Sequence, residues 1–160
     1  MTITVFSPEK LITSFPYGMI QKITPETDYE SLVTMRDAMK ENYASITSRR
    51  GGGTYRYLGG LLSDAVYRSI VTGNTFLTPP DPGPVIPLAG STKINSGNLN
   101  RDHSEVCREH KKWVNLERVG KNQITESVSK TFLDGSFDWN RGFAHIRGKL
   151  SHIFLQSTVR

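Results

Sequence analysis

Residues 48–60 hold the side chains whose types and spacing come nearest to a chemical site. The stretch is S-R-R-G-G-G-T-Y-R-Y-L-G-G, with five glycines and three arginines. Backbone amides in glycine-rich turns can bind an anion, and Arg49, Arg50 and Arg56 would add positive charge. The nucleotide-binding pattern G-x-x-x-x-G-K-[ST] is missing, and a G-x-G-x-x-G that starts at Gly51 would need glycine where Arg56 stands. We therefore interpret the stretch as a structural loop with an exposed basic rim.

The histidines suggest a second kind of chemistry. His103 and His110 are seven residues apart, as are His145 and His152, so each pair would share a helix face two turns apart. Metal ligands on a helix usually stand at i and i+4, and the lone Cys107 cannot complete a zinc set. No G-x-S-x-G motif presents a nucleophile. We expect half-buried structural histidines, no metal, no cofactor and no enzymatic activity.

The composition limits the class of protein further. The chain has 160 residues and a net charge of +5, which fits one domain and favours polyanionic partners. No segment approaches the roughly 20 apolar residues of a membrane span. A single cysteine and the lack of a leader-like start favour a reducing compartment. We expect a cytoplasmic protein that binds neither a membrane nor a small-molecule substrate.

The basic residues fall in two regions without acids. No acid stands between Glu41 and Asp64, the interval that contains the three loop arginines, and none follows Asp138. After Asp138 come Arg141, Arg147, Lys149 and Arg160. Residues 101–121 instead mix both signs of charge, as a solvated helix face does. The charged residues of this mixed segment include Asp102, Glu105, Arg108, Glu109, Lys111, Lys112, Glu117, Arg118 and Lys121.

Helical spacing dominates the chain after its first 24 residues. A proline in the first turn and a capping box of Thr27 with Glu30 predict a helix from about residue 25 to Ser45. Its apolar residues recur every three or four positions, which predicts a buried stripe. The stripe consists of Leu32, Met35, Met39 and Tyr43. Residues 1–24 show no sustained period, and we expect an arm packed on the domain.

A short helix and a proline-rich segment follow the glycine loop. Ser63 predicts the start of the helix, which Gly73 would end. Five prolines between Pro79 and Pro87 exclude a helix and favour an extended, polyproline-like path. Apolar residues flank the prolines, so we expect this segment to lie against the domain.

The rest of the chain is again helical in pattern. Helical spacing returns at about Leu99, weakens at Gly120 and continues to a break at residues 134–136. The last helix would carry the apolar stripe Ile146, Leu150, Ile153 and Phe154. The chain is thus predicted to be all-α, a compact bundle of about five helices with an ordered Gly-rich loop and a Pro-rich extended segment. Residues 25–160 would form a single domain.

Three motifs in order carry a family resemblance. The first is a Gly-Gly-Gly-x-x-x-x-Leu-Gly loop made by Gly51, Gly52, Gly53, Leu58 and Gly59. The second is Phe76 followed by the Pro-x-Pro-Gly-Pro of residues 80–84. The third is Gly142-Phe143-Ala144 before a terminal Leu150-x-His152 helix. Over about residues 20–156 the chain resembles the N-terminal, capsid-like region of the Gag polyprotein of copia-type LTR retrotransposons.

The resemblance implies a structural protein that self-associates into capsid-like particles and binds RNA nonspecifically by charge. Arg49, Arg50 and Arg56 are then expected to contact RNA, and Ile153 and Phe154 to contact a neighbouring copy. Such a homo-oligomer requires no active site. The family's Cys-x2-Cys-x4-His-x4-Cys zinc knuckle is missing here, so we expect the assembly portion alone, as a fragment or a degenerate copy.

A function from a different class stays open. A helical adaptor, domesticated or unrelated, would bind a protein partner through the Pro-rich segment or a helix groove. A particle that grows with RNA would favour the Gag-like protein, and a monomer indifferent to RNA would favour the adaptor.

Overall fold

The computed structural model describes residues 7–24, 26, 29–48, 55–73, 75–86, 89–90 and 92–129. They form the α-helices α1 (Pro8–Ser14), α2 (Tyr29–Ser45), α3 (Asp64–Ile70) and α4 (Lys93–Ser127), with a 3-10 turn, η2 (Leu58–Gly60), before α3. These residues contain no strand, and an isolated bridge pairs Ile23 with Val128. The all-α prediction is confirmed for this part of the chain.

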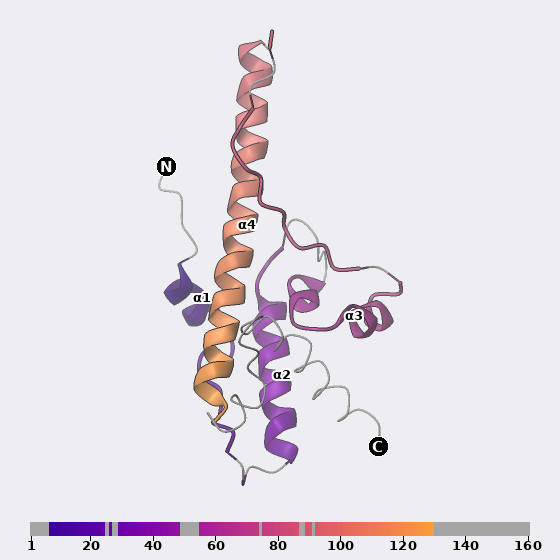
Figure 1. Cartoon of the computed structure of the whole chain (residues 1–160), viewed down its shortest axis with the longest axis vertical. Helices are drawn as coiled ribbons and strands as arrows, with labels where there is room; N and C mark the ends of the chain where they lie inside the picture. Colours follow the sequence, from indigo (N-terminus) through magenta and orange to yellow (C-terminus); the bar gives the residue numbers. More distant parts are fainter. Residues whose placement is uncertain are drawn as a thin grey trace, which may run out of the picture.

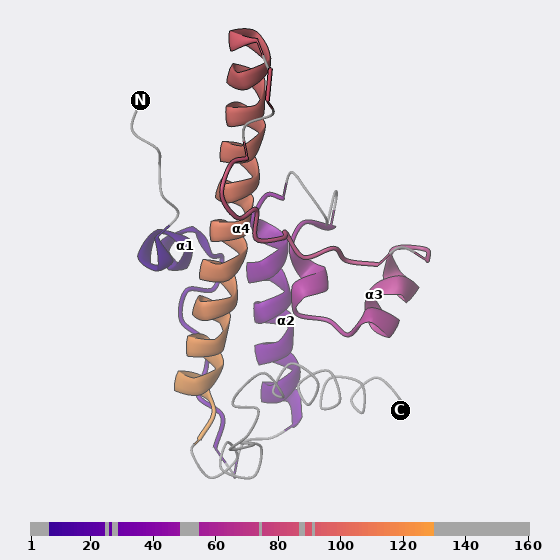
Figure 2. The ribbon, with the colours of Figure 1, turned by 45° about the horizontal axis from the view of Figure 1, so that its top comes forward.

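Helix α4 is the longest helix in the described part of the chain. Its 35 residues extend for about 52 Å at about 1.5 Å per residue. Helix α2 lies beside its lower half, and α1 lies on the other side (Figures 1 and 2). The two long helices are antiparallel, because Thr47 at the end of α2 meets Lys112, whereas Tyr43 one turn earlier meets Leu116. The first half of α4 projects beyond α2.

Two expectations about α4 are wrong. The helix begins at Lys93, six residues before the predicted Leu99, because the Thr92 hydroxyl caps it by accepting from the Asn95 amide at 3.4 Å. It also ends at Ser127, before the predicted break at residues 134–136, because Val128 leaves the helix with φ −98° and ψ +133°. Between these ends the helix continues through Gly120, where the sequence predicted a weak point. A Cβ at residue 120 would overlap the Tyr43 phenol. The glycine thus marks a close contact with α2 inside a continuous helix.

Part of the N-terminal arm is helical, although its sequence shows no sustained period. The Ser7 hydroxyl accepts from the Lys10 amide at 3.4 Å and Pro8 opens α1. Leu11 is fully buried in the contact between α1 and α4, and Phe15 is 7% exposed. The arm therefore contributes directly to the core.

The chain after α1 is fixed by a polar contact between three segments. The backbone amide of Tyr17 donates to Asn42 Oδ1 at 2.9 Å, and Asn42 Nδ2 donates to the Tyr17 carbonyl at 2.8 Å. Gln123 on α4 donates to the same carbonyl and to that of Gly18 at 3.1 Å. Because Asn42 is fully buried, these bonds satisfy polar groups that water does not reach.

The predicted stripe of α2 forms the centre of the core. Met35, Met39 and Tyr43 are at most 5% exposed, and Leu32 packs against them. From α4 come Leu116 and Val119, with Ile124 nearer its end. Helical periodicity therefore identified the buried face of α2 correctly.

Residues 75–86 of the Pro-rich segment form neither helix nor strand, and the chain turns at Gly83, whose φ is +60° and whose amide donates to Asp81 Oδ1 at 3.0 Å. Phe76 and Pro79 are buried, and the Pro79 carbonyl lies 3.0 Å from Nδ1 of the half-buried His110. Leu77 and Ile86 are 67% and 79% exposed. The segment thus contacts the domain at its start, whereas apolar side chains further along face solvent.

Helix α3 begins where the sequence predicted. The Ser63 hydroxyl accepts from the Val66 amide at 3.4 Å, and the helix ends at Ile70, three residues before Gly73, whose φ of +92° favours glycine. The predicted break at residues 134–136 and the last helix with Ile146 and Leu150 lie outside the described residues.

Candidate functional site

Arg56 anchors the chain that follows the glycine loop. Its Nη1 donates to the carbonyls of Ala44 and Ser45 at 3.0 and 2.8 Å. Those carbonyls belong to the last turn of α2, where a helix has unpaired acceptors and the negative end of its dipole. The φ of Arg56 is +53°, a left-handed conformation that costs a residue with a side chain about 1 kcal/mol. The two charge-assisted hydrogen bonds offset that cost.

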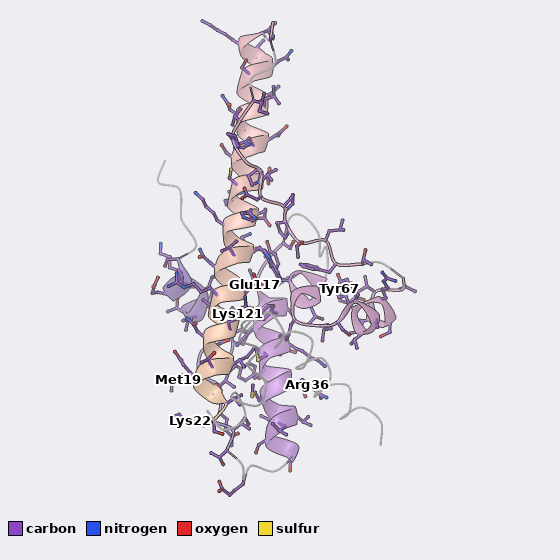
Figure 3. All side chains as sticks on the ribbon, in the orientation of Figure 1. Met19, Lys22, Arg36, Tyr67, Glu117 and Lys121 are labelled. Carbon is purple, nitrogen blue, oxygen red and sulfur yellow. The ribbon has the colours of Figure 1, made fainter. Side chains whose placement is uncertain are left out.

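Five aromatic side chains form a cluster around η2, and Tyr55 joins it through an edge-on contact with Tyr67 at 6.5 Å. The Tyr57 ring stacks on Trp113 of α4 with centroids 6.0 Å apart, and Phe76 meets Trp113 at 5.6 Å. The Tyr67 ring of α3 packs edge-on against Phe76 at 5.9 Å. The cluster therefore joins the loop, α3, the Pro-rich segment and α4. Tyr67, which belongs to α3, is labelled in Figure 3.

Two glycines of η2 allow this cluster to close. A Cβ at Gly59 would lie closer than 3.0 Å to the Phe76 side chain, and one at Gly60 would overlap the Trp113 ring. Both glycines are buried. Their role here is to let aromatic rings lie directly on the backbone.

A buried polar network lies next to the cluster. The Tyr57 hydroxyl donates to Glu109 Oε2 at 2.8 Å, and Lys112 Nζ donates to Glu109 Oε1 at 2.7 Å. Lys112 also donates to the Thr47 carbonyl at 3.0 Å. Glu109 is fully buried and Lys112 is 4% exposed. The network thus ties α4 to the end of α2 and to the start of η2.

The network perturbs its phenol. Burial raises the pKa of Tyr57 well above its usual value, and the hydrogen bond to Glu109 and the carboxylate's charge raise it further. A contact with the Ser48 side chain acts in the opposite direction. Because the tyrosine is fully buried, it keeps its proton and acts as a donor to Glu109.

The burial of Glu109 and Lys112 corrects the sequence analysis, which placed both on a solvated face of the segment 101–121. The two residues are three positions apart and lie on the side of α4 that continues into Leu116 and Val119. Extending the apolar stripe of α4 toward its start would have identified them. Composition alone could not, because Lys and Glu are seldom fully buried unless paired.

This arrangement can stabilise a loop, but it presents no chemistry to a ligand. The Glu109 carboxylate accepts from two side chains of the protein itself and has no exposure to solvent. Within the described ranges, no three His, Cys, Asp or Glu side chains could together hold a metal ion. None of the helices in those ranges has the length and hydropathy of a membrane span.

Some of the predicted site residues are among those that the structure describes, and others are not. Leu58 and Gly59 are described, and they pack in η2. Arg56 is half-buried and bound to α2. The others lie outside the described residues: Arg49, Arg50, Gly51, Gly52, Gly53, Ile153 and Phe154. RNA contact and self-association stay predictions.

Comparison with models of protein families, with curated proteins and with solved structures found no match to this chain.

Proposed function

We propose that this chain is a Gag-like structural protein of a retrotransposon, which self-associates into capsid-like particles and binds RNA nonspecifically through its charge. The proposal rests on three sequence motifs and the order in which they occur: the glycine loop, the Pro-rich segment and the C-terminal motif. A particle-forming protein needs a defined helical domain and weak contacts between identical copies. The all-α framework is compatible with that requirement.

The distribution of charge supports the RNA-binding part of the proposal. The described residues contain thirteen lysines and arginines against twelve aspartates and glutamates. The remaining residues contain seven bases against three acids, including Arg49, Arg50 and the basic stretch after Asp138. Most of the net charge of +5 thus lies outside the near-neutral helical framework.

The structural observation that best supports RNA binding by Arg49 and Arg50 is that both flanks of the glycine loop are held by hydrogen bonds. On one side the Thr47 carbonyl is bound by Lys112, and on the other Arg56 is bound to α2. Residues 49–54 therefore join two anchored ends. An arginine pair between fixed ends needs less ordering on binding an anion than one on a free chain.

A negative charge introduced into the predicted C-terminal apolar stripe tests self-association. Phe154→Asp should abolish oligomers in sedimentation while the far-ultraviolet circular dichroism is unchanged. Leu150→Asp, the matched control on the same predicted stripe, should unfold the domain, since the prediction that Leu150 packs in the core implies an unpaired buried charge in this variant. If Phe154→Asp associates like the parent, the proposed interface is wrong.

The adaptor is the second candidate, and the exposure of Leu77 and Ile86 favours it. Apolar side chains on a proline-rich segment are the features that groove-forming partner domains recognise. An adaptor would stay monomeric with and without RNA. Light scattering on the two samples separates this function from the Gag-like one.

A further inference from the structure

The solvent side of α4 carries a row of four cations. Arg101 and Arg108 are seven residues apart, as are Lys111 and Arg118, and Arg108 is three residues before Lys111. Separations of three and seven place side chains on the same side of an α-helix. All four residues are exposed, and we call them the basic row. From first to last, the row extends for about 26 Å along the helix axis.

Three of the four acids between Arg101 and Arg118 form a row of their own on another side of the helix, and the fourth, Glu117, lies 3.6 Å from Lys121. Asp102, Glu105 and Glu109 follow one another at separations of three and four, so they form a separate row. Glu109, the last of them, faces the core and is fully buried. The acidic row therefore continues the core-facing side of α4 into its projecting half. Charges that alternate along the sequence are thus separated around the helix.

Local acids neutralise the basic row only in part. Arg108 Nη2 lies 3.6 Å from Glu105, with 43% of its side chain exposed, and the charge of Arg118 acts on Glu9 of α1. In the described part of the chain, Arg101 and Lys111 form no salt bridge. Exposed pairs such as Arg108 with Glu105 are worth little energetically, and a phosphate can replace the carboxylate.

The geometry of the row indicates the kind of polyanion. The upper half of α4 stands clear of α2, although the chain between α3 and α4 runs along one side of it (Figures 1 and 2). The four cations of the basic row are exposed with this segment in place, so a large partner can reach them. Among the described residues, the exposed Phe, Tyr or Trp side chains are Tyr17 and Tyr55, and neither is on α4. Single-stranded RNA is usually bound with aromatic stacking platforms, which this surface lacks. A straight row of cations on a rigid helix suits phosphates that a duplex holds in place.

We propose that the basic row of α4 binds the phosphate backbone of double-stranded RNA without sequence preference. The inference rests on the proposed function and adds a surface separate from Arg49 and Arg50. Duplex regions of a packaged RNA would lie along α4.

The test uses the full chain and two triple variants with the same change of charge. Arg101→Gln, Arg108→Gln and Lys111→Gln are combined to remove most of the row. The control combines Lys22→Gln, Lys40→Gln and Arg68→Gln, which lie outside α4. Binding to a duplex RNA of about 20 base pairs and to a single strand of equal length is followed by fluorescence anisotropy across a salt titration.

The row variant should lose duplex affinity, and the slope of log K against log salt should flatten by about 2.7, which corresponds to three phosphate contacts. The control should change that slope by less than about 1. Equal effects of the two variants, or tighter binding of the single strand by the parent, would contradict duplex binding by the basic row. Either result would leave the proposed function intact. A parent chain that binds neither RNA would overturn both.

Discussion

The Tyr57 hydroxyl and the Glu109 carboxylate form a 2.8 Å hydrogen bond at a place where neither residue has any exposure to solvent. Tyr57 comes directly after Arg56, which caps α2, and Glu109 is on α4. The bond therefore joins the chain after the glycine loop to the longest helix. It makes the position of the segment around Tyr57 depend on a buried charge.

Removing the phenol oxygen should be costly. Tyr57→Phe deletes a hydrogen bond to a buried carboxylate, and the free energy of unfolding should fall by about 1.5 to 3 kcal/mol. Urea denaturation followed by circular dichroism measures the change. The matched control is Tyr55→Phe, whose hydroxyl is on a side chain 38% exposed, and it should change stability by less than about 0.5 kcal/mol. Equal losses would mean that the Glu109 bond adds nothing.

The buried ion pair should show strong coupling. Lys112→Met leaves the Glu109 carboxylate buried without its cation, and we expect a loss of about 3 to 5 kcal/mol. Adding Glu109→Gln to that variant removes the uncompensated charge, so the double variant should be more stable than Lys112→Met alone. A double variant that loses the sum of both single effects would contradict the coupling.

Stability should fall at alkaline pH because of Tyr57. Its pKa in the folded state is raised, so above about pH 10 the unfolded chain loses a phenol proton that the folded chain retains. The folded state then binds more protons, and stability decreases with rising pH by up to about 1.4 kcal/mol per pH unit from this residue. Urea unfolding at several values above pH 9 should show a shallower loss for Tyr57→Phe. An identical slope in both proteins would exclude this contribution.

The effect of replacing a glycine with alanine should depend on the space around that glycine. Gly60→Ala places a methyl group into the Trp113 ring and should destabilise by about 1 to 3 kcal/mol. Gly97→Ala is the control, because nothing lies within 4 Å of a Cβ there and the residue is inside α4. It should stabilise the protein by about 0.5 to 1 kcal/mol. Thermal melting of both variants checks the contrast, which fails if both shift in the same direction.

The loop arginines should separate into an anchor and two contacts. Arg56→Gln should lower stability by about 1 kcal/mol, since α2 loses its cap. Arg49→Gln with Arg50→Gln should leave melting unchanged and flatten the salt dependence of RNA binding by about 1.4, the value for two contacts to a single strand. If the double variant binds RNA with an unchanged slope, these two arginines are not contacts.

Sequence patterns predicted those parts of the fold that depend on neighbours along the chain. The stripe of α2 follows from periodicity, and the start of α3 follows from Ser63. The start of α1 carried a comparable signal in Ser7 followed by Pro8, but a helix of seven residues with one buried side chain, Leu11, is too short to show a period. Local patterns of this kind need no knowledge of the partner.

The rest depends on tertiary partners. Residue 120 has no side chain because the Tyr43 phenol occupies the space where a Cβ would lie. Glu109 can be buried because Tyr57 and Lys112 each donate to one of its carboxylate oxygens. Nothing near these residues in the sequence indicates such partners. The separation of bases and acids around α4 follows from spacing within a helix that the sequence already predicted from about Leu99 to Gly120. Only the mixture of charges along this segment was described from the sequence, and their placement around the helix was not.

Sedimentation velocity of the full chain with increasing amounts of RNA tests the Gag-like assignment most directly. We predict that the sedimentation coefficient rises with RNA far beyond that of one chain bound to one RNA, and that it returns to the value of the free protein as salt screens the charges. A chain that sediments as a monomer at every ratio of RNA to protein would contradict the account.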